Sequence, residues 1–101
     1  MECARAIAAL RAHEQELRQA GVLSASLFGS VARGEGVGND VDIAVRLGEN
    51  FSPRGLAYFT RLSELEMRLS CIVGCSVDVV EEPVRKKRFQ SEIDRDRALA
   101  F

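Results

Sequence analysis

The sequence predicts an α+β (or α/β) domain in which helices flank a small mixed β-sheet. Three short segments have the β-branched and alternating apolar residues of strands, and segments with helical periodicity lie between and around them. Because a helix or a long turn separates each strand from the next, a mixed sheet is expected. The length of 101 residues suits a single domain, residues 1–101.

The first half of the chain alternates between helix and strand signals. Residues 2–20 are rich in strong helix formers with apolar residues near helical spacing, which predicts an amphipathic helix that ends at Gly21. Residues 22–28 (VLSASLF) alternate apolar and polar side chains, as in a strand packed on one face. Residues 29–39 contain four of the eight glycines and predict a loop with one short helical turn. Residues 40–46 (DVDIAVR) favour a second strand.

The second half begins with a helix start signal, Ser52 followed by Pro53. The helix is expected to run to about Cys71, and an apolar stripe at helical spacing marks its buried face. The stripe consists of Leu56, Phe59, Leu62, Leu65, Leu69 and Ile72. Residues 75–80 (CSVDVV) predict a third strand, and residues 84–100 predict one or two short polar helices. The apolar anchors of that last segment are Val84, Phe89, Ile93 and Leu99.

Composition and charge argue against several classes of protein. The 14 basic and 15 acidic side chains give a net charge of −1, which disfavours binding of duplex nucleic acid through its phosphates. The chain has no run of about 18 apolar residues, so no membrane span is expected. Its first residues lack the pattern of an export signal, and we therefore expect a cytoplasmic protein.

Three cysteines, Cys3, Cys71 and Cys75, lie in apolar segments, and the last two have no nearby His to complete a zinc site. We expect buried, reduced thiols without a chemical role, with a disulfide between Cys71 and Cys75 as the alternative. His13 is surrounded by acidic and amide residues in the first helix and is expected at the surface.

Three aspartates form the candidate metal-binding set. Asp40 and Asp42 are two positions apart on a predicted strand, so their side chains point to the same face. The two carboxylates repel, and a divalent cation with a preference for hard oxygen ligands, Mg²⁺ above all, would compensate. Asp78 lies in a strand otherwise suited to burial, where a carboxylate is costly unless it is paired or binds metal. If the strands are adjacent, about 4.8 Å apart, all three aspartates meet.

Gly29 and Ser30 follow a strand and open a helical turn, a geometry in which backbone N–H groups and the Ser hydroxyl can bind a phosphate. The segment is not a Walker loop, since no Lys follows the glycines, and its Gly spacing does not fit a dinucleotide-binding loop. A phosphate turn together with an acidic cluster predicts one ligand, a nucleoside triphosphate with Mg²⁺.

These residues form the pattern G-S-x-A-R-G-E…(S/N)-D-x-D…D, which resembles the minimal nucleotidyltransferases of the DNA polymerase β-like superfamily. Within that superfamily, the size resembles the stand-alone antitoxin partners of HEPN-domain toxins. The resemblance is strongest over residues 22–45 and weaker over residues 75–82, and Asn39 stands where the family most often has Ser. The residues that carry it are Gly29, Ser30, Ala32, Arg33, Gly34, Glu35, Asp40, Val41, Asp42 and Asp78.

The resemblance implies a polymerase β-like nucleotidyltransferase fold and a role for each matched residue. Asp40 and Asp42 would hold two metal ions, and Asp78 would complete the site and could take the proton of the acceptor hydroxyl. Gly29 and Ser30 would bind the β and γ phosphates of ATP. The implied reaction is transfer of AMP to a protein, such as a Tyr hydroxyl of the cognate HEPN toxin, which would silence the toxin.

Two other functions stay open at this point. One is an antitoxin that neutralises its partner by binding alone. The other is a nucleotidyltransferase for small molecules of the antibiotic type, which the short length disfavours because such enzymes carry a further helical domain for the acceptor.

Arg33 either steadies the triphosphate or ends the short helix before Gly34, and Glu35 is expected at the surface. A basic run could contact the triphosphate or an acidic partner, although an exposed helix face is the default interpretation. The run consists of Arg85, Lys86, Lys87 and Arg88.

Overall fold

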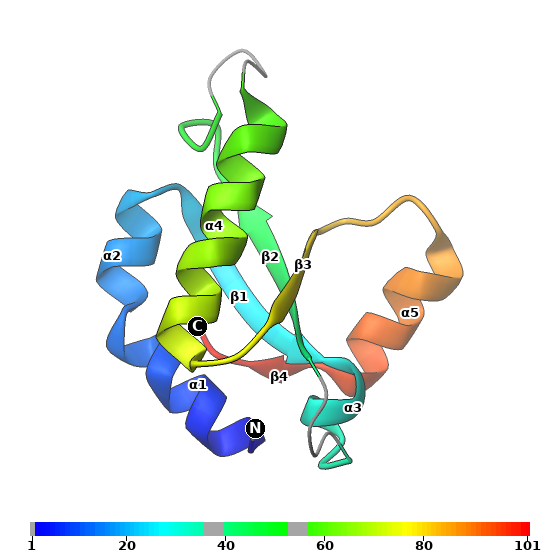
Figure 1. Ribbon diagram of the computed structural model, residues 1–101. Coiled ribbons are helices and arrows are strands. Elements are labelled where there is room, and N and C mark those ends of the chain that lie inside the picture. The colour runs from blue at the N-terminus through cyan, green and yellow to red at the C-terminus, as the bar shows by residue number, and fades with distance from the viewer. Residues whose placement is uncertain (1, 36–39, 53–56) are drawn as a thin grey trace.

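The computed structural model describes residues 2–35, 40–52 and 57–101. Five helices and four strands lie within these residues, and Figure 1 shows their arrangement. In chain order they are α1 (Cys3–Ala12), α2 (Glu14–Gln19), β1 (Val22–Phe28), α3 (Gly29–Ala32), β2 (Val41–Leu47), α4 (Tyr58–Val73), β3 (Val77–Glu81), α5 (Lys87–Asp96) and β4 (Ala98–Leu99).

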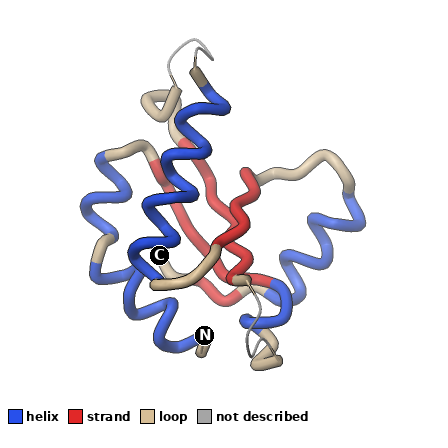
Figure 2. Tube along the Cα trace, in the orientation of Figure 1, coloured by secondary structure: helices blue, strands red, loops and turns tan. Residues whose placement is uncertain are grey.

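The strands form one mixed sheet in the order β3-β2-β1-β4, shown in red in Figure 2. β1 is antiparallel to both β2 and β4, whereas β2 and β3 run parallel. The structure therefore confirms the expected α+β class with a small mixed sheet. It corrects the expectation for residues 84–100 in one respect: only α5 is helical, and β4 pairs with β1 at the edge of the sheet.

The two faces of the sheet are covered differently. One face packs against α1, α2 and α4, and alternate residues of the strands, such as Leu27, Ile43 and Val45, are fully buried there. The other face contacts α5, where Ile93 packs with Phe28 and Ala44 in a smaller apolar cluster. Because side chains alternate across a strand, Asp42 lies on this second, thinly covered face, between the buried Val41 and Ile43.

Two helix boundaries differ from the expected ones. The predicted helix over residues 2–20 is broken at His13, since α1 packs against α4 while α2 packs against β1. The start of α4 at Tyr58 also corrects the expectation that Ser52 caps this helix. Ala57, the residue directly before α4, has a left-handed backbone that a right-handed helix does not contain, and Phe51 is buried against Gly21. Pro53 and Leu56 lie outside the described residues.

The apolar stripe of α4 is confirmed at its centre and wrong at its start. Leu65 and Leu69 are buried, whereas Phe59 is 80% exposed. Gly74 ends the helix in the left-handed conformation. Leu99 is 54% exposed, so it is not the anchor expected from the sequence.

All three cysteines are free, but none is fully buried as expected: Cys71 is exposed on the outer side of α4, and Cys3 and Cys75 are half-buried. None of the described helices has the length and apolar character needed to cross a membrane.

Candidate active site

Two of the predicted aspartates are direct neighbours across the sheet. Asp42 of β2 pairs in register with Asp78 of β3, and in a parallel pair the side chains of such partners lie on the same face, with strands about 4.8 Å apart. Asp42 is half-buried, while Asp78 is exposed because β3 is an edge strand. Asp40 is exposed and lies one residue before β2. The structure thus brings together Asp42 and Asp78, which are 36 positions apart in sequence.

The three carboxylates share one electrostatic environment. Burial raises the pKa of Asp42 above its usual value, and the negative charges of Asp78 and Asp40 raise the pKa further, while Arg33 opposes the rise. Even so, within residues 2–35, 40–52 and 57–101, no three His, Cys, Asp or Glu side chains are placed to hold a metal ion together. The residue types fit Mg²⁺, because all are carboxylates and their mutual repulsion favours a cation, but the side chains would have to turn toward it.

The turn after β1 places Gly29 directly against Asp42. Gly29 has a positive φ of 74°, and a Cβ atom built there would lie 3.2 Å from Cγ of Asp42 and overlap its Oδ2. Two independent constraints therefore favour glycine at this position: the left-handed backbone conformation and the close approach of the Asp42 carboxylate. The predicted phosphate turn and the predicted metal-binding residues are in contact.

The short helix α3 is held firmly at this position. Its Val31 is 1% exposed in the main core, and the Arg33 and Gly34 N–H groups close the turn on Gly29 and Val31 at 3.1 and 3.0 Å. The Glu35 N–H donates to the Ser30 carbonyl at 2.8 Å. The predicted helical turn at residues 30–33 is confirmed as α3, which begins one residue earlier.

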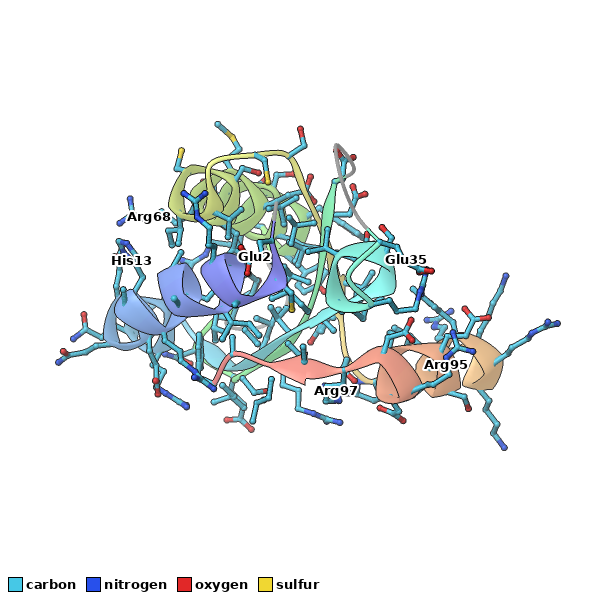
Figure 3. The ribbon with its side chains drawn as sticks, turned by 90° about the horizontal axis from the view of Figure 1, so that it is seen from below. Glu2, His13, Glu35, Arg68, Arg95 and Arg97 are labelled. Carbon is cyan, nitrogen blue, oxygen red and sulfur yellow. The ribbon has the colours of Figure 1, made fainter. Side chains whose placement is uncertain are left out.

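Arg33 is the first residue after α3 and forms two charged hydrogen bonds. Its Nε donates to Glu35 at 2.6 Å and its Nη1 donates to Asp96 of α5 at 2.7 Å. Glu35 is exposed, as expected. Asp96 had no sequence signal, since it lies 63 positions from Arg33 in a segment of alternating charges. In Figure 3, Glu35 and Arg95 lie at the same end of the molecule, on the α3 and α5 side.

The basic run lies at the other end of α5. All four residues from Arg85 to Arg88 are exposed, which confirms the default interpretation. α5 begins within this run and ends at Asp96, so about nine residues at 1.5 Å each, roughly 14 Å, separate the run from the contact with Arg33. This separation argues against a contact between the run and a triphosphate at α3.

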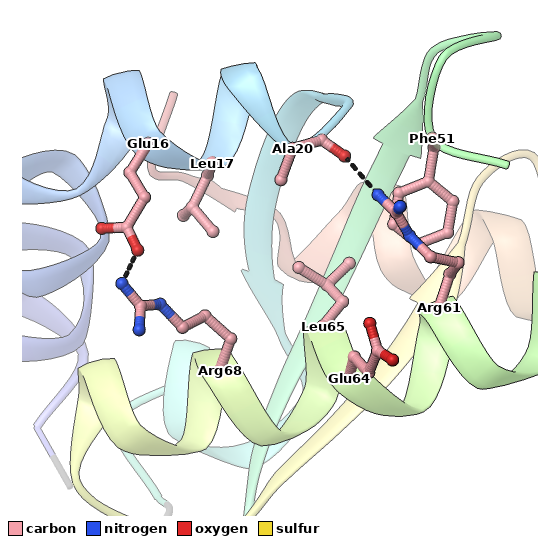
Figure 4. A pocket seen from close by; sticks show the side chains of 8 residues that line it. All are labelled: Glu16, Leu17, Ala20, Phe51, Arg61, Glu64, Leu65 and Arg68. Carbon is pink, nitrogen blue, oxygen red and sulfur yellow. Dashed lines mark hydrogen bonds and ion pairs between the residues drawn. The ribbon is translucent and has the colours of Figure 1, made fainter.

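A pocket also lies between α2 and α4, away from the carboxylates (Figure 4). It measures about 180 Å³, below the range of about 300–1,000 Å³ usual for ligand sites, and none of the predicted site residues lines it. Its arginines are engaged: Arg68 pairs with Glu16, and Arg61 donates to the Ala20 carbonyl and lies over the Phe51 ring. Glu16 also bonds His13, which is far from Glu35 in Figure 3. Neither this pocket nor the contact between Glu16 and His13 belongs to the candidate site.

Known proteins resemble the chain in both fold and sequence. Seven solved chains are similar to it, among them one whose own assignment as a minimal nucleotidyltransferase is provisional. That structure superposes with a TM-score of 0.75 at 25% identity, over 97% of this chain and 95% of the other. No curated protein sequence matches. Residues 10–99 match the nucleotidyltransferase domain family, and the chain belongs to that family.

Proposed function

We propose that this protein is a Mg²⁺-dependent adenylyltransferase that transfers AMP from ATP to a hydroxyl group of another protein. The observation that carries the proposal is the contact of the Gly29 turn with Asp42, which itself pairs with Asp78. This arrangement joins groups suited to a triphosphate and groups suited to its metal in one place. Because ATP and Mg²⁺ are abundant in the cytoplasm, we propose that the reaction occurs there.

On the donor side, the N–H groups of Gly29 and Ser30 would bind the β and γ phosphates, where the start of α3 favours negative charge. Asp40, Asp42 and Asp78 would hold Mg²⁺, which when bound neutralises the phosphates and stabilises the leaving oxygen. The raised pKa of Asp42 supports this assignment, because a carboxylate repelled by its neighbours gains stability when a cation is present.

On the acceptor side, the hydroxyl oxygen forms a bond to the α phosphorus and the bond to the β phosphate breaks, so that pyrophosphate leaves. The hydroxyl proton passes to Asp78. Asp78 suits this role because it is exposed on an edge strand, where a large acceptor can approach.

The acceptor that we propose is a Tyr hydroxyl of a cognate HEPN-domain toxin, whose modification would make this chain an antitoxin. Support comes from the structural similarity to a chain provisionally assigned as a minimal nucleotidyltransferase, which covers 95% of that chain. A small hydroxylated acceptor of the antibiotic type is the other candidate substrate.

An antitoxin that acts by binding alone is the second candidate function. One observation favours it: within the described residues, the aspartates are not arranged as a ready-made metal site. In that case the nucleotide site would serve assembly or regulation rather than transfer.

The test is incubation of the protein and its partner with Mg²⁺ and ATP labelled at the α phosphate. We expect label on a Tyr of the partner and loss of partner toxicity, both abolished by Asp42→Asn. A matched control is Asp94→Asn, since Asp94 is exposed on α5 and contacts Gln90 and Arg97 instead of the aspartate cluster. Neutralisation without label would support binding alone, and label on a small hydroxylated compound would support the other substrate.

A further inference from the structure

Asp96 is a carboxylate with little access to solvent and two basic partners. Its side chain is 6% exposed at the C-terminal end of α5. It accepts hydrogen bonds from Nη1 of Arg33 at 2.7 Å and from Nε of Arg95 at 3.2 Å. A carboxylate with so little exposed surface is costly unless its charge is compensated, which favours the charged hydrogen bond from Arg33, a side chain that is itself 43% exposed.

The two acceptors of Arg33 fix the plane of its guanidinium group. Glu35 receives the bond from Nε and Asp96 receives the bond from Nη1. Because the guanidinium is planar and rigid, two anchors on different nitrogens determine where the third nitrogen points. Nη2 makes no hydrogen bond to any of the residues that the structure describes. Arg33 lies one helical turn from the phosphate turn, because its backbone N–H donates to the Gly29 carbonyl at 3.1 Å, and its positive charge opposes the rise in the pKa of Asp42.

The end of α5 is anchored independently of Asp96. The next residue, Arg97, donates two hydrogen bonds to Glu82, at 2.8 and 2.5 Å, and one to the Ser26 hydroxyl at 3.1 Å. The Glu82 side chain is fully buried at the end of β3. These contacts tie the end of α5 to β1 and to the end of β3. Because they do not involve the Asp96 side chain, a substitution of Asp96 leaves them in place.

We propose that Asp96 is a positioning residue for nucleotide binding: together with Glu35 it holds the Arg33 guanidinium in place, so that Nη2 is presented to the triphosphate at Gly29 and Ser30. This inference rests on the proposed function. It also assigns α5 a role in the site, since Asp96 at the end of this helix contacts Arg33, the residue that follows α3.

The effect of removing Asp96 follows from preorganisation. Without this anchor, Arg33 must be ordered when the nucleotide binds rather than when the chain folds. The ordering of one long side chain corresponds to a factor of about 2 to 13 in affinity. We therefore expect Asp96→Ala to raise the Kd for Mg²⁺-ATP and the KM for ATP by this factor, with kcat close to that of the wild type.

The test is calorimetry of Mg²⁺-ATP binding to wild type, Asp96→Ala, Arg33→Ala and the double variant, with thermal melting of each. If Asp96 acts through Arg33, Asp96→Ala has no further effect on the Kd for Mg²⁺-ATP when Arg33 is already Ala. Asp96→Glu, which keeps the charge, should bind Mg²⁺-ATP more tightly than Asp96→Ala. Asp94→Ala is the matched control, because Asp94 lies on the same helix and contacts Arg97 instead of Arg33.

An unchanged Kd in Asp96→Ala, tighter binding, or an equal loss in the Arg33→Ala background would overturn the positioning role while the proposed function stands. Absence of Mg²⁺-ATP binding by the wild type would overturn the proposed function, and this inference with it.

Discussion

Replacement of Gly29 by Ala tests whether the glycine turn and Asp42 form one site. The new residue would have to adopt a φ of +74°, which costs an L-residue about 1–2 kcal/mol. Its Cβ would lie 3.2 Å from Cγ of Asp42 and overlap Oδ2, so the carboxylate must turn away. An off-rotamer side chain adds about 0.5–1.5 kcal/mol. We expect a total loss of about 1.5–3.5 kcal/mol in the free energy of unfolding.

The same change should weaken Mg²⁺-ATP binding, because Asp42 is displaced from the position that faces Asp78. Disturbance of a side chain that positions a metal ligand typically costs a factor of about 10–100 in metal affinity. We expect a loss of this size by calorimetry, measured alongside urea unfolding. The two measurements separate the effect on the site from the effect on the fold.

Gly74→Ala is the matched control. Gly74 also has a positive φ, of 82°, but a Cβ built there meets nothing within 4 Å, and it lies at the end of α4. This variant should lose about 1–2 kcal/mol from backbone strain alone and bind Mg²⁺-ATP like the wild type. If Gly29→Ala kept wild-type affinity for Mg²⁺-ATP, the reasoning that couples this turn to Asp42 would be refuted.

Three further changes test other parts of the structure. Glu82→Gln should cost about 2–3 kcal/mol at pH 7 in urea unfolding, because it removes the buried charged partner of Arg97 and leaves the exposed Asp94 as its acidic partner; Arg97 itself is 26% exposed. The hydrogen bonds from Arg97 lower the pKa of Glu82, so the pair stabilises the folded wild type above about pH 4.5. This contribution is lost as the pH falls through the lower pKa of Glu82 in the folded state. Equal dependence of the unfolding free energy on pH in wild type and variant would contradict the pairing. Asp42→Asn should abolish nucleotide transfer, and retained transfer would refute the metal assignment. The free energy of unfolding should stay within about 0.5 kcal/mol of the wild-type value or rise slightly, since the change relieves repulsion between the aspartates. Phe59→Ser should change stability by less than about 0.5 kcal/mol, whereas Leu69→Ala should cost about 2–5 kcal/mol, and similar losses would show that the exposed and buried sides of α4 are misassigned.

The sequence was sufficient wherever a local pattern determines the structure. The alternation in β1, the β-branched residues of β2 and the apolar spacing in the middle of α4 each predict their element from neighbouring residues. The family match likewise depends on short motifs in and between these elements. The register that pairs Asp42 with Asp78 required the structure, although the chemistry of the two residues already suggested that they meet.

Elements that depend on distant partners could not be predicted in this way. β4 has two residues and exists because Ala98 and Leu99 pair with β1, more than 70 positions away. α4 begins at Tyr58, directly after the left-handed Ala57, and not at the local start signal of Ser52. Asp96 is unremarkable among the neighbouring charges until the fold places it beside Arg33.

Calorimetry of ATP binding with and without Mg²⁺ tests the central claim most directly. For the wild type we expect binding that requires Mg²⁺, lost in both Asp42→Asn and Asp78→Asn and kept in Asp94→Asn. Binding that is independent of Mg²⁺, or unchanged in the Asp42 and Asp78 variants, would contradict the assignment of this end of the sheet as the nucleotide site.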